Sequence, residues 1–163
     1  MKKAKLIIPA EIDYLATVRD FIDKQGKKNY FSSRVIHAIK LATEEACTNI
    51  IRHGYTHVLY GKIKIKTVVR HFSFTVILYD QGKSFDPRQV RTPDLKKYVE
   101  RGKIGGLGIM MIQRLVDVMD YKVTKNGNEF HLTKYCEELK RNKLFQLWCM
   151  FKIYLRRLLK YAS

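Results

Sequence analysis

Residues 44–55 read EEACTNIIRHGY, and the interpretation of the whole chain starts from this stretch. If it is helical, Glu45 and Asn49 share one face, because residues four apart stack in an α-helix, and His53 continues the line by one more turn. Such a line is either a solvated stripe or one wall of a site, and the helix alone does not distinguish the two. In a site, a carboxylate and an amide one turn apart can activate a nucleophile and hold Mg²⁺.

The apolar pattern around this stretch predicts two helices after a short strand. Residues 6–8 are predicted as the strand, and residues 9–11 open a helix that ends near Gly26. Ser32 and Ser33 can cap a second helix, which we expect to end near Gly54. Apolar residues at three- and four-residue steps define the buried sides: Ile12, Leu15, Val18, Phe21 and Ile22 in the first helix, and Val35, Ile36, Ile39, Ala42, Ala46, Ile50 and Ile51 in the second.

After Gly61, apolar residues alternate with basic ones, as in a strand with one wet face. Residues 62–70 are therefore predicted as a strand and residues 72–79 as its partner. Residues 109–118 are predicted as a helix, and residues 121–124 and 129–133 as a hairpin around the turn Asn126-Gly127. Residues 81–106 are rich in glycine, proline and charge and are too long for an ordinary connection, which favours a lid over a site.

Two glycine-containing motifs flank the predicted lid. Residues 80–86 read DQGKSFD after a strand, and residues 104–108 read IGGLG before a helix. Asp and Gly are ordinary turn residues, so the first motif is weak alone. A P-loop at residues 82–84 is rejected, because that motif requires a glycine where Ile77 stands. The amides of the second motif can bind phosphate at a helix N-terminus.

The three motifs in this order resemble those of the Bergerat-fold (GHKL) ATPases, the superfamily of gyrase and the histidine kinases. The resemblance is closest to the anti-sigma-factor serine/threonine kinases: residues 44–55 are similar to their N box, residues 80–86 to their first glycine box and residues 105–108 to their second. It implies an α+β fold, a two-layer sandwich in which a mixed, mainly antiparallel β-sheet is covered on one face by helices. The expected ATP-binding domain is residues 1–135.

The same resemblance implies roles for single residues. Glu45 would be the general base for the incoming hydroxyl, and Asn49 would bind the Mg²⁺ that bridges the phosphates of ATP. Asp80 would accept a hydrogen bond from the adenine amino group, and Gly82 would let the backbone approach the ring. Gly105, Gly106 and Gly108 would let the lid close over the triphosphate. The other expected ATP-binding residues are His53, Phe85, Leu107, Arg101 and Lys103, of which the last two are equally consistent with solvated lid charges.

One position departs from the family pattern. Many relatives carry a threonine near the final hairpin that touches phosphate, whereas this chain has Asn128. The departure motivates an alternative function, a catalytically weak, ATP-dependent regulatory module that senses nucleotide and binds a partner protein or a membrane surface.

The composition is that of a strongly basic globular chain. Lys and Arg number 32 against 15 Asp and Glu, and the net charge of +17 attracts nucleotides, nucleic acid, acidic proteins or anionic lipid. Cys47, Cys136 and Cys149 form no CxxC pair, which argues against a disulfide framework or a zinc site. The apolar stretch at the N-terminus is too short for a signal peptide, so we expect a cytoplasmic protein.

Residues 136–163 lie outside the resemblance and are predicted to form a basic amphipathic helix. Its apolar run is shorter than the ~20 residues that span a bilayer. Three roles stay open: packing on its own domain, pairing with another chain, or contact of residues 139–163 with a membrane surface. The apolar positions are Leu144, Leu147, Trp148, Phe151, Leu155 and Leu158.

The function implied by the resemblance is that of a protein serine/threonine kinase in a partner-switching system. Such a kinase transfers the γ-phosphate of ATP to a Ser or Thr of a small antagonist protein and alternatively sequesters a sigma factor. We expect a homodimer and no direct nucleic-acid binding. A protein that bound nucleic acid or membrane through charge alone would show a steep salt dependence without ATP, and would leave the ordered motifs unexplained.

Overall fold

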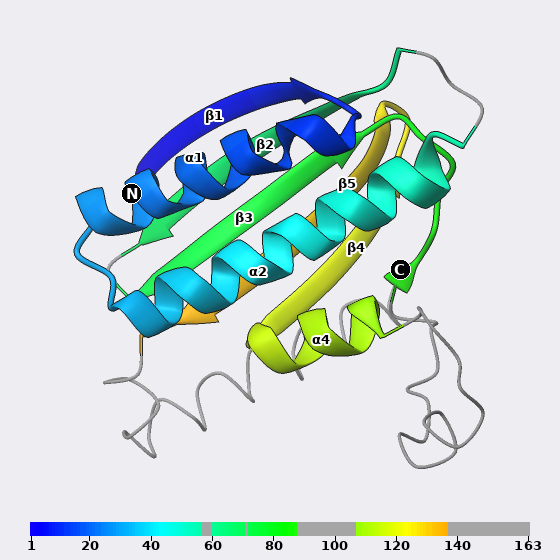
Figure 1. The fold of residues 1–163 in the computed structure, drawn as a ribbon. Helices are drawn as coiled ribbons and strands as arrows, with labels where there is room; N and C mark the ends of the chain where they lie inside the picture. The colour runs from blue at the N-terminus through cyan, green and yellow to red at the C-terminus, as the bar shows by residue number, and fades with distance from the viewer. Residues whose placement is uncertain (57–59, 71, 88–106, 137–163) are drawn as a thin grey trace.

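The computed structural model describes residues 1–56, 60–70, 72–87 and 107–136. Five strands and five helical segments follow one another along these residues (Figure 1). In chain order they are β1 (Lys2–Pro9), the 3₁₀ turn η1 (Ile12–Tyr14), α1 (Leu15–Lys28), α2 (Ser33–Asn49), the π-helical segment η2 (Ile50–Gly54), β2 (Lys62–Arg70), β3 (Ser73–Asp80), α4 (Gly108–Leu115), β4 (Val118–Thr124) and β5 (Gly127–Tyr135).

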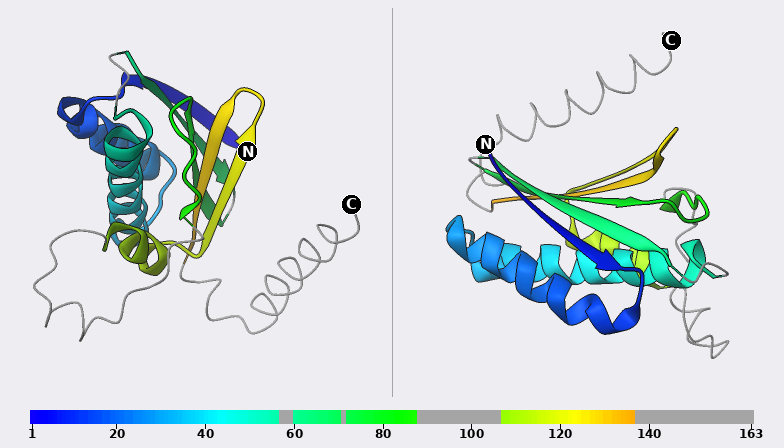
Figure 2. Two further views of the ribbon diagram at one scale, coloured as in Figure 1. Left: turned by 90° about the vertical axis from the view of Figure 1, so that its right-hand side faces the viewer. Right: turned by 90° about the horizontal axis from the view of Figure 1, so that it is seen from above.

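The strands form one sheet in the order β1-β2-β3-β5-β4, and every pairing among the described strands is antiparallel. The helices α1, α2 and α4 lie on one side of this sheet (Figure 2). The expected two-layer α+β fold is confirmed. β5 is the last of the described strands and ends at Tyr135; the domain boundary expected at residues 135/136 stays a prediction.

The period-two alternation of the strands produces the two faces of the sheet. In β2, Ile63 and Ile65 are fully buried toward the helices, while the alternating residues Lys62 and Lys64 are exposed on the other face. In β3, Phe74 and Leu78 continue the buried side, and the Phe74 ring stacks on Phe31 from the α1–α2 connection with centroids 5.3 Å apart. Burial of this apolar surface is the main term that holds the two layers together.

The helix α2 runs through the centre of the helical layer. Ser32 is its N-cap, and the Ser32 side chain accepts a hydrogen bond from the Val35 N–H as predicted. Ile39 and Ala46 are fully buried, and so is Cys47, where burial raises the pKa of the thiol to about 12 and keeps it protonated.

Several element ends, and the geometry of the last turn after α2, differ from the sequence expectation. β1 is longer than residues 6–8, because its backbone pairs with β2 as far back as Lys2↔Val69. The first helix begins with the turn η1 and continues past Gly26. A Cβ at this glycine would lie 2.5 Å from the Ile36 side chain, so Gly26 allows the two helices to pack closely and does not end the helix. The helical backbone does reach Gly54, but with π geometry after Asn49. α4 ends at Leu115, because Val118 already pairs with Thr133 in the sheet.

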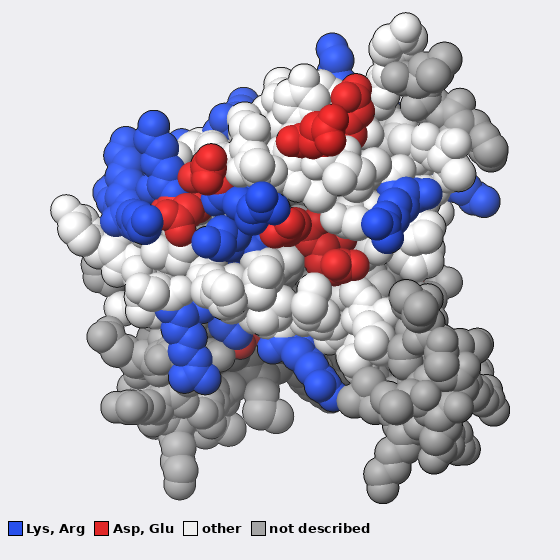
Figure 3. Space-filling view, viewed as in Figure 1, with Lys and Arg blue, Asp and Glu red and all other residues white. Residues whose placement is uncertain are grey.

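Two predicted features fall largely outside the described residues. These are residues 88–106 of the lid and residues 137–163 of the predicted C-terminal helix. None of the described helices has the length and apolarity needed to cross a bilayer. Seen from the helical side, the surface mixes Lys and Arg with Asp and Glu (Figure 3).

Candidate functional site

Three segments that are distant in sequence meet at one end of the sheet: the end of α2 with η2, the loop that follows β3, and the start of α4. Two hydrogen bonds tie the first two segments together. The Lys83 N–H donates to the Gly54 carbonyl at 2.8 Å, and the Gln81 N–H donates to the Tyr55 hydroxyl at 2.9 Å. Residues 44–55 and residues 80–86, the two motifs that the sequence singles out first, therefore lie side by side.

The carboxylate of Asp80 lies at the floor of this region. Asp80 is the last residue of β3 and is 5% exposed. Its Oδ1 accepts two hydrogen bonds, one from the Gly82 N–H at 2.9 Å and one from the Asn128 side-chain amide at 2.9 Å. Both donors use Oδ1, which fixes the carboxylate plane and leaves Oδ2 as the acceptor for a ligand.

Asn128 is the partner that orients Asp80. It faces Asp80 across the β3–β5 ladder and is 3% exposed. Its amide also donates to the Gly82 carbonyl at 3.1 Å, and its oxygen accepts from the Ser84 hydroxyl at 2.8 Å. The asparagine that departs from the family pattern thus connects β5 to β3 and to the loop after it.

Gly82 is required by a close approach of backbones. A Cβ at this position would lie 2.7 Å from the Gly54 carbonyl oxygen. Tyr55 supports the same approach, since its hydroxyl donates to the Lys62 carbonyl at 3.0 Å and accepts from Gln81. The resemblance assigns Gly82 to contact with the ring of the nucleotide; the structure adds that no side chain fits between the loop and η2.

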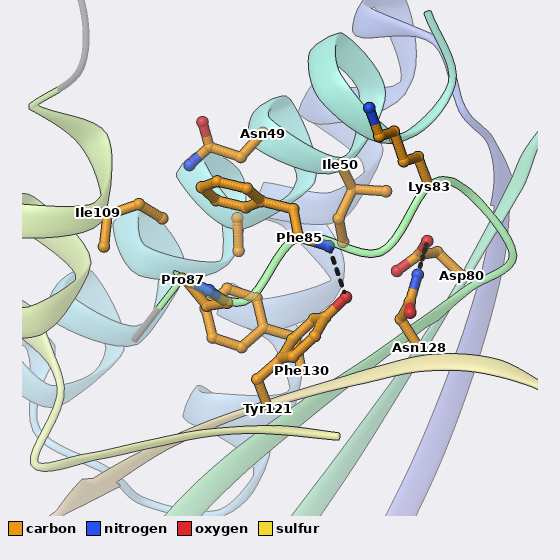
Figure 4. A pocket seen from close by; sticks show the side chains of 12 residues that line it. Asn49, Ile50, Asp80, Lys83, Phe85, Pro87, Ile109, Tyr121, Asn128 and Phe130 are labelled. Atoms are coloured by element: carbon orange, nitrogen blue, oxygen red, sulfur yellow. Dashed lines mark hydrogen bonds between the residues drawn. The ribbon is translucent and has the colours of Figure 1, made fainter. Parts of the chain in front are cut away.

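Two adjoining hollows open between these segments. The first, called here the apolar hollow, has Asp80 and Asn128 on one side and aromatic rings on the other (Figure 4). The Phe85 N–H donates to the Tyr121 hydroxyl at 3.0 Å, which ties the loop to β4. The lining residues are Ala46, Asn49, Ile50, Gly54, Asp80, Lys83, Phe85, Pro87, Ile109, Tyr121, Asn128 and Phe130.

The second hollow, called here the polar hollow, shares Asn49, Phe85 and Ile109 with the first and carries charged side chains. Its floor includes the start of α4, where the N-cap residue Leu107 has no polar side chain to cap the first-turn N–H groups. The lining residues are Glu45, Thr48, Asn49, Arg52, His53, Phe85, Leu107, Gly108, Ile109 and Met111.

The adjacent carboxylates Glu44 and Glu45 have separate environments. Glu44 forms an ion pair with Arg19 of α1 at 2.5 Å and so joins the two helices. Glu45 lines the polar hollow, and a Cβ at Gly108 would overlap its carboxylate. The absence of a side chain at Gly108 is therefore what gives the Glu45 carboxylate its place beside α4.

The side-chain amide of Asn49 faces both hollows. Its Nδ2 atom is buried and has no hydrogen-bond partner within the described part of the chain. Because the two ends of an amide are assigned from such networks, either the nitrogen or the oxygen can be turned toward a ligand. An amide oxygen is a ligand that Mg²⁺ accepts, so Asn49 fits the predicted metal role chemically.

Comparison with protein families matches residues 8–134 to the histidine kinase-like ATPase domain. The chain belongs to this family. An ATPase domain acts on ATP, which confirms the nucleotide that the motifs predicted. The assignment of Mg²⁺ stays a prediction.

Similar proteins within the family carry the name serine-protein kinase RsbW. The chain is 34% identical over 134 residues to RsbW of Bacillus velezensis, an alignment that covers 78% of this chain and 82% of the relative. It is 30% identical over 141 residues to RsbW of Bacillus cereus, covering 83% of this chain and 86% of that protein. The resemblance to the anti-sigma-factor kinases is thereby confirmed.

Two solved structures share the fold. The RsbU and RsbW domains of a Mycobacterium tuberculosis protein superpose with a TM-score of 0.61 at 17% identity, covering 83% of this chain; the chain spans only 33% of that longer chain. A blue-light activated histidine kinase domain from Erythrobacter litoralis gives a TM-score of 0.50 at 15% identity, covering 80% of this chain and 63% of the other. At these identities the likeness concerns the fold alone.

The structure brings most of the predicted site residues of this ATPase domain together. Glu45, Asn49, His53, Phe85, Leu107 and Gly108 border the polar hollow, and Asp80 lies in the apolar hollow. His53 lies in the π-helical segment η2 and borders the polar hollow, where its ring centroid is 6.3 Å from that of Phe85. The predicted residues outside the described part of the chain are Arg101, Lys103, Gly105 and Gly106.

The sequence assigns no site role to four residues that build the site: Tyr55, Tyr121, Arg52 and Asn128. Arg52 and Tyr55 lie within the N box, and Asn128 is the residue that departs from the family pattern. The hydroxyl contacts of Tyr55 and Tyr121 join residues 26 and 36 positions apart, and no local pattern signals them.

The burial of the Asp80 carboxylate leads to a prediction about how the stability of the protein depends on pH. Burial raises the pKa of Asp80, and the hydrogen bonds from Asn128 and Gly82 oppose this only in part. A raised folded-state pKa means that ionised Asp80 costs stability at neutral pH, and that this cost disappears as the pH falls through the raised pKa. We therefore expect Asp80→Asn to unfold at higher urea concentration than the wild type at neutral pH, with the gap closing on acidification.

Asp23 supplies a control, because its pKa shift and therefore its effect on the pH dependence of stability have the opposite sign to those of Asp80. A hydrogen bond from Lys27 lowers the pKa of Asp23, so its contribution to stability is present at neutral pH and lost on acidification. Asp23→Asn should be the less stable protein at neutral pH, and its deficit should shrink as the pH falls. A gap for Asp80→Asn that widened in acid would contradict the assigned environment of Asp80.

Proposed function

We propose that this chain is a cytoplasmic, Mg²⁺-dependent protein serine/threonine kinase that transfers the γ-phosphate of ATP to a small antagonist protein and alternatively binds a sigma factor. The observation that carries the proposal is the position of Glu45, which lines the polar hollow next to the apolar hollow that contains Asp80. The neighbouring Glu44 instead forms an ion pair with Arg19. The names of the relatives support the same activity and, with it, a partner protein that accepts the phosphate.

The apolar hollow suits the adenine ring. Tyr121 and Phe130 supply aromatic surface, and Asp80 supplies a fixed acceptor at the floor. Asp80 can accept a hydrogen bond from the adenine amino group, whereas guanine presents a carbonyl oxygen that would face the carboxylate. A buried acceptor left facing another acceptor is costly, so this one residue discriminates between the two bases.

The polar hollow suits the phosphates. The first turn of α4 presents backbone N–H groups at a helix N-terminus, which favours an anion. Arg52 and His53 border the same space and can add positive charge. When bound, Mg²⁺ neutralises phosphate charge, and Asn49 is the residue that would hold it here.

Glu45 carries the chemical step. Its carboxylate accepts the proton of the incoming Ser or Thr hydroxyl as that oxygen bonds to the γ-phosphorus and ADP departs with the bridging oxygen. Gly108 leaves the space that this carboxylate occupies. The protein's share of catalysis is thus positioning and one proton transfer, which needs few residues.

The first prediction concerns base selectivity. Asp80→Ala should reduce ATP affinity by about 10- to 100-fold, the effect of losing a hydrogen bond to a charged group, and should abolish the preference for ATP over GTP. Calorimetric titration measures both. Glu129→Gln is the matched control, because Glu129 neighbours Asn128 in β5 but pairs with His131 instead. Equal affinity of the wild type for ATP and GTP would refute the base site.

The second prediction uses the neighbouring carboxylates as a pair. Glu45→Gln should lower phosphoryl transfer by about 10²- to 10⁴-fold, the range for loss of a general base, and leave ATP affinity largely unchanged. Glu44→Gln should retain transfer, because its ion pair with Arg19 is partly exposed and worth about 0–1 kcal/mol. Transfer of radiolabel from ATP to an antagonist protein encoded beside the kinase gene is the measurement.

The outcome of this comparison also separates the two candidate functions. A wild-type protein that binds ATP but labels no antagonist protein would favour the catalytically weak regulatory module. Equal transfer by the wild type and Glu45→Gln would show that Glu45 is not the base.

The third prediction concerns the metal. Asn49→Ala should weaken binding of ATP in the presence of Mg²⁺ and have little effect when EDTA is present, because Asn49 would act through the ion. Thr48→Ala is the control, since Thr48 borders the same hollow but donates its hydroxyl to the Glu44 carbonyl within the helix. A similar loss with and without Mg²⁺ would mean that Asn49 contacts the nucleotide directly.

A further inference from the structure

The face of the sheet opposite the helices carries a cluster of basic side chains that the proposed kinase site does not use. The alternation of β1 and β2 directs these side chains to the same face, and the antiparallel register brings the two rows together, with Lys5 opposite Lys66. We call this cluster the lysine face; it comprises Lys3, Lys5, Lys62, Lys64, Lys66 and Arg70.

The lysine face has a single sign of charge. Within β1, β2 and β3, the residues on this face include no Asp or Glu; the first carboxylates in sheet order are Glu129 on β5 and Asp120 on β4. Glu129 already has His131 as a partner at 3.0 Å. The helical side differs, since acidic and basic side chains alternate there (Figure 3).

Such an arrangement is unfavourable for the isolated fold. Lys5 and Lys66 are directly opposite in adjacent strands, and like charges in that relation destabilise a sheet. Neither lysine has an ion-pair partner within the part of the chain that the structure describes. An anionic partner seated on this face would remove the repulsion, so the face has the character of a binding surface.

We propose that the lysine face docks the domain on an anionic membrane surface. Two observations favour lipid over other polyanions. Ile7 is 61% exposed and sits opposite Lys64 within the cluster, so the face offers an apolar side chain to the interface as well as charge. Tyr79 of β3 lies beside Lys64 on the same side of the sheet, and the Lys64 ammonium is 4.5 Å from the centroid of its ring, where it occupies a surface on which a nucleic-acid base would stack.

The sequence beyond β5 is consistent with the same partner. Residues 137–163 combine many Lys and Arg with Leu, Trp and Phe, the composition of an interfacial segment. Two weak anionic-lipid contacts on one chain reinforce one another, because the second binds at high effective concentration. The docked domain would keep its nucleotide hollows accessible, since those lie on the helical side of the sheet.

Co-sedimentation of the full chain with vesicles tests the proposal. We expect binding to vesicles that contain phosphatidylglycerol, weak binding to pure phosphatidylcholine, and release at high salt. The triple variant Lys5→Gln, Lys64→Gln, Lys66→Gln should bind the anionic vesicles about 100-fold more weakly, at about fivefold for each lysine removed. Its thermal unfolding midpoint should not fall, because the substitutions remove a like-charge pair.

The matched control carries the same loss of charge elsewhere. Lys24→Gln, Lys28→Gln, Lys125→Gln removes three exposed lysines of α1 and of the β4–β5 turn, and should bind anionic vesicles nearly as well as the wild type. Equal weakening of both triple variants would overturn the proposal, because only net charge would then matter. So would wild-type binding to neutral vesicles at the same strength, or binding of duplex DNA or polyglutamate with the same lysine dependence and no vesicle binding.

Discussion

The buried carboxylate of Asp80 is the constraint on which the site depends. Its Oδ1 atom is held by Asn128 from β5 and by the Gly82 N–H from the following loop, and these bonds define where β3 stops and the loop turns. Gly82 then lies against Gly54, so the same carboxylate indirectly sets the distance between the loop and the end of α2. A charge buried in this way lowers stability at neutral pH, which is consistent with a residue kept for binding rather than for folding.

The adjacent glutamates Glu44 and Glu45 have different contacts because successive residues of a helix point in different directions. Glu44 points toward α1 and contributes an ion pair to the packing of two helices, whereas Glu45, one position on, borders the hollow and lies against Gly108. The same rotation places Cys47 in the core and Asn49 at the junction of the two hollows. A single helix thereby supplies a packing surface, a carboxylate and an amide without any irregularity before Asn49.

The sheet has two faces with different physical roles. Its helical side is apolar, is closed by α1, α2 and α4, and leads at one end to the two hollows. Its other side is basic at the β1–β2 edge, and the lysines there oppose one another across the ladder rather than pairing with acids. The alternation of β2 produces both faces at once, because every second residue is apolar and the others are mostly basic.

The sequence by itself determined the secondary structure and the family, because helix caps, apolar periods and the spacing of Glu45, Asn49, Asp80 and Gly82 are local properties of the chain. It also indicated which carboxylate faces the site, through the resemblance. Only the tertiary structure decided where elements end: β1 reaches Lys2 through its pairing with β2, and Gly26 is a packing contact with Ile36. The role of Asn128 was also decided only by the tertiary structure. Its contact with Asp80 joins residues 48 positions apart and depends on the register of β3 and β5, which no local pattern encodes.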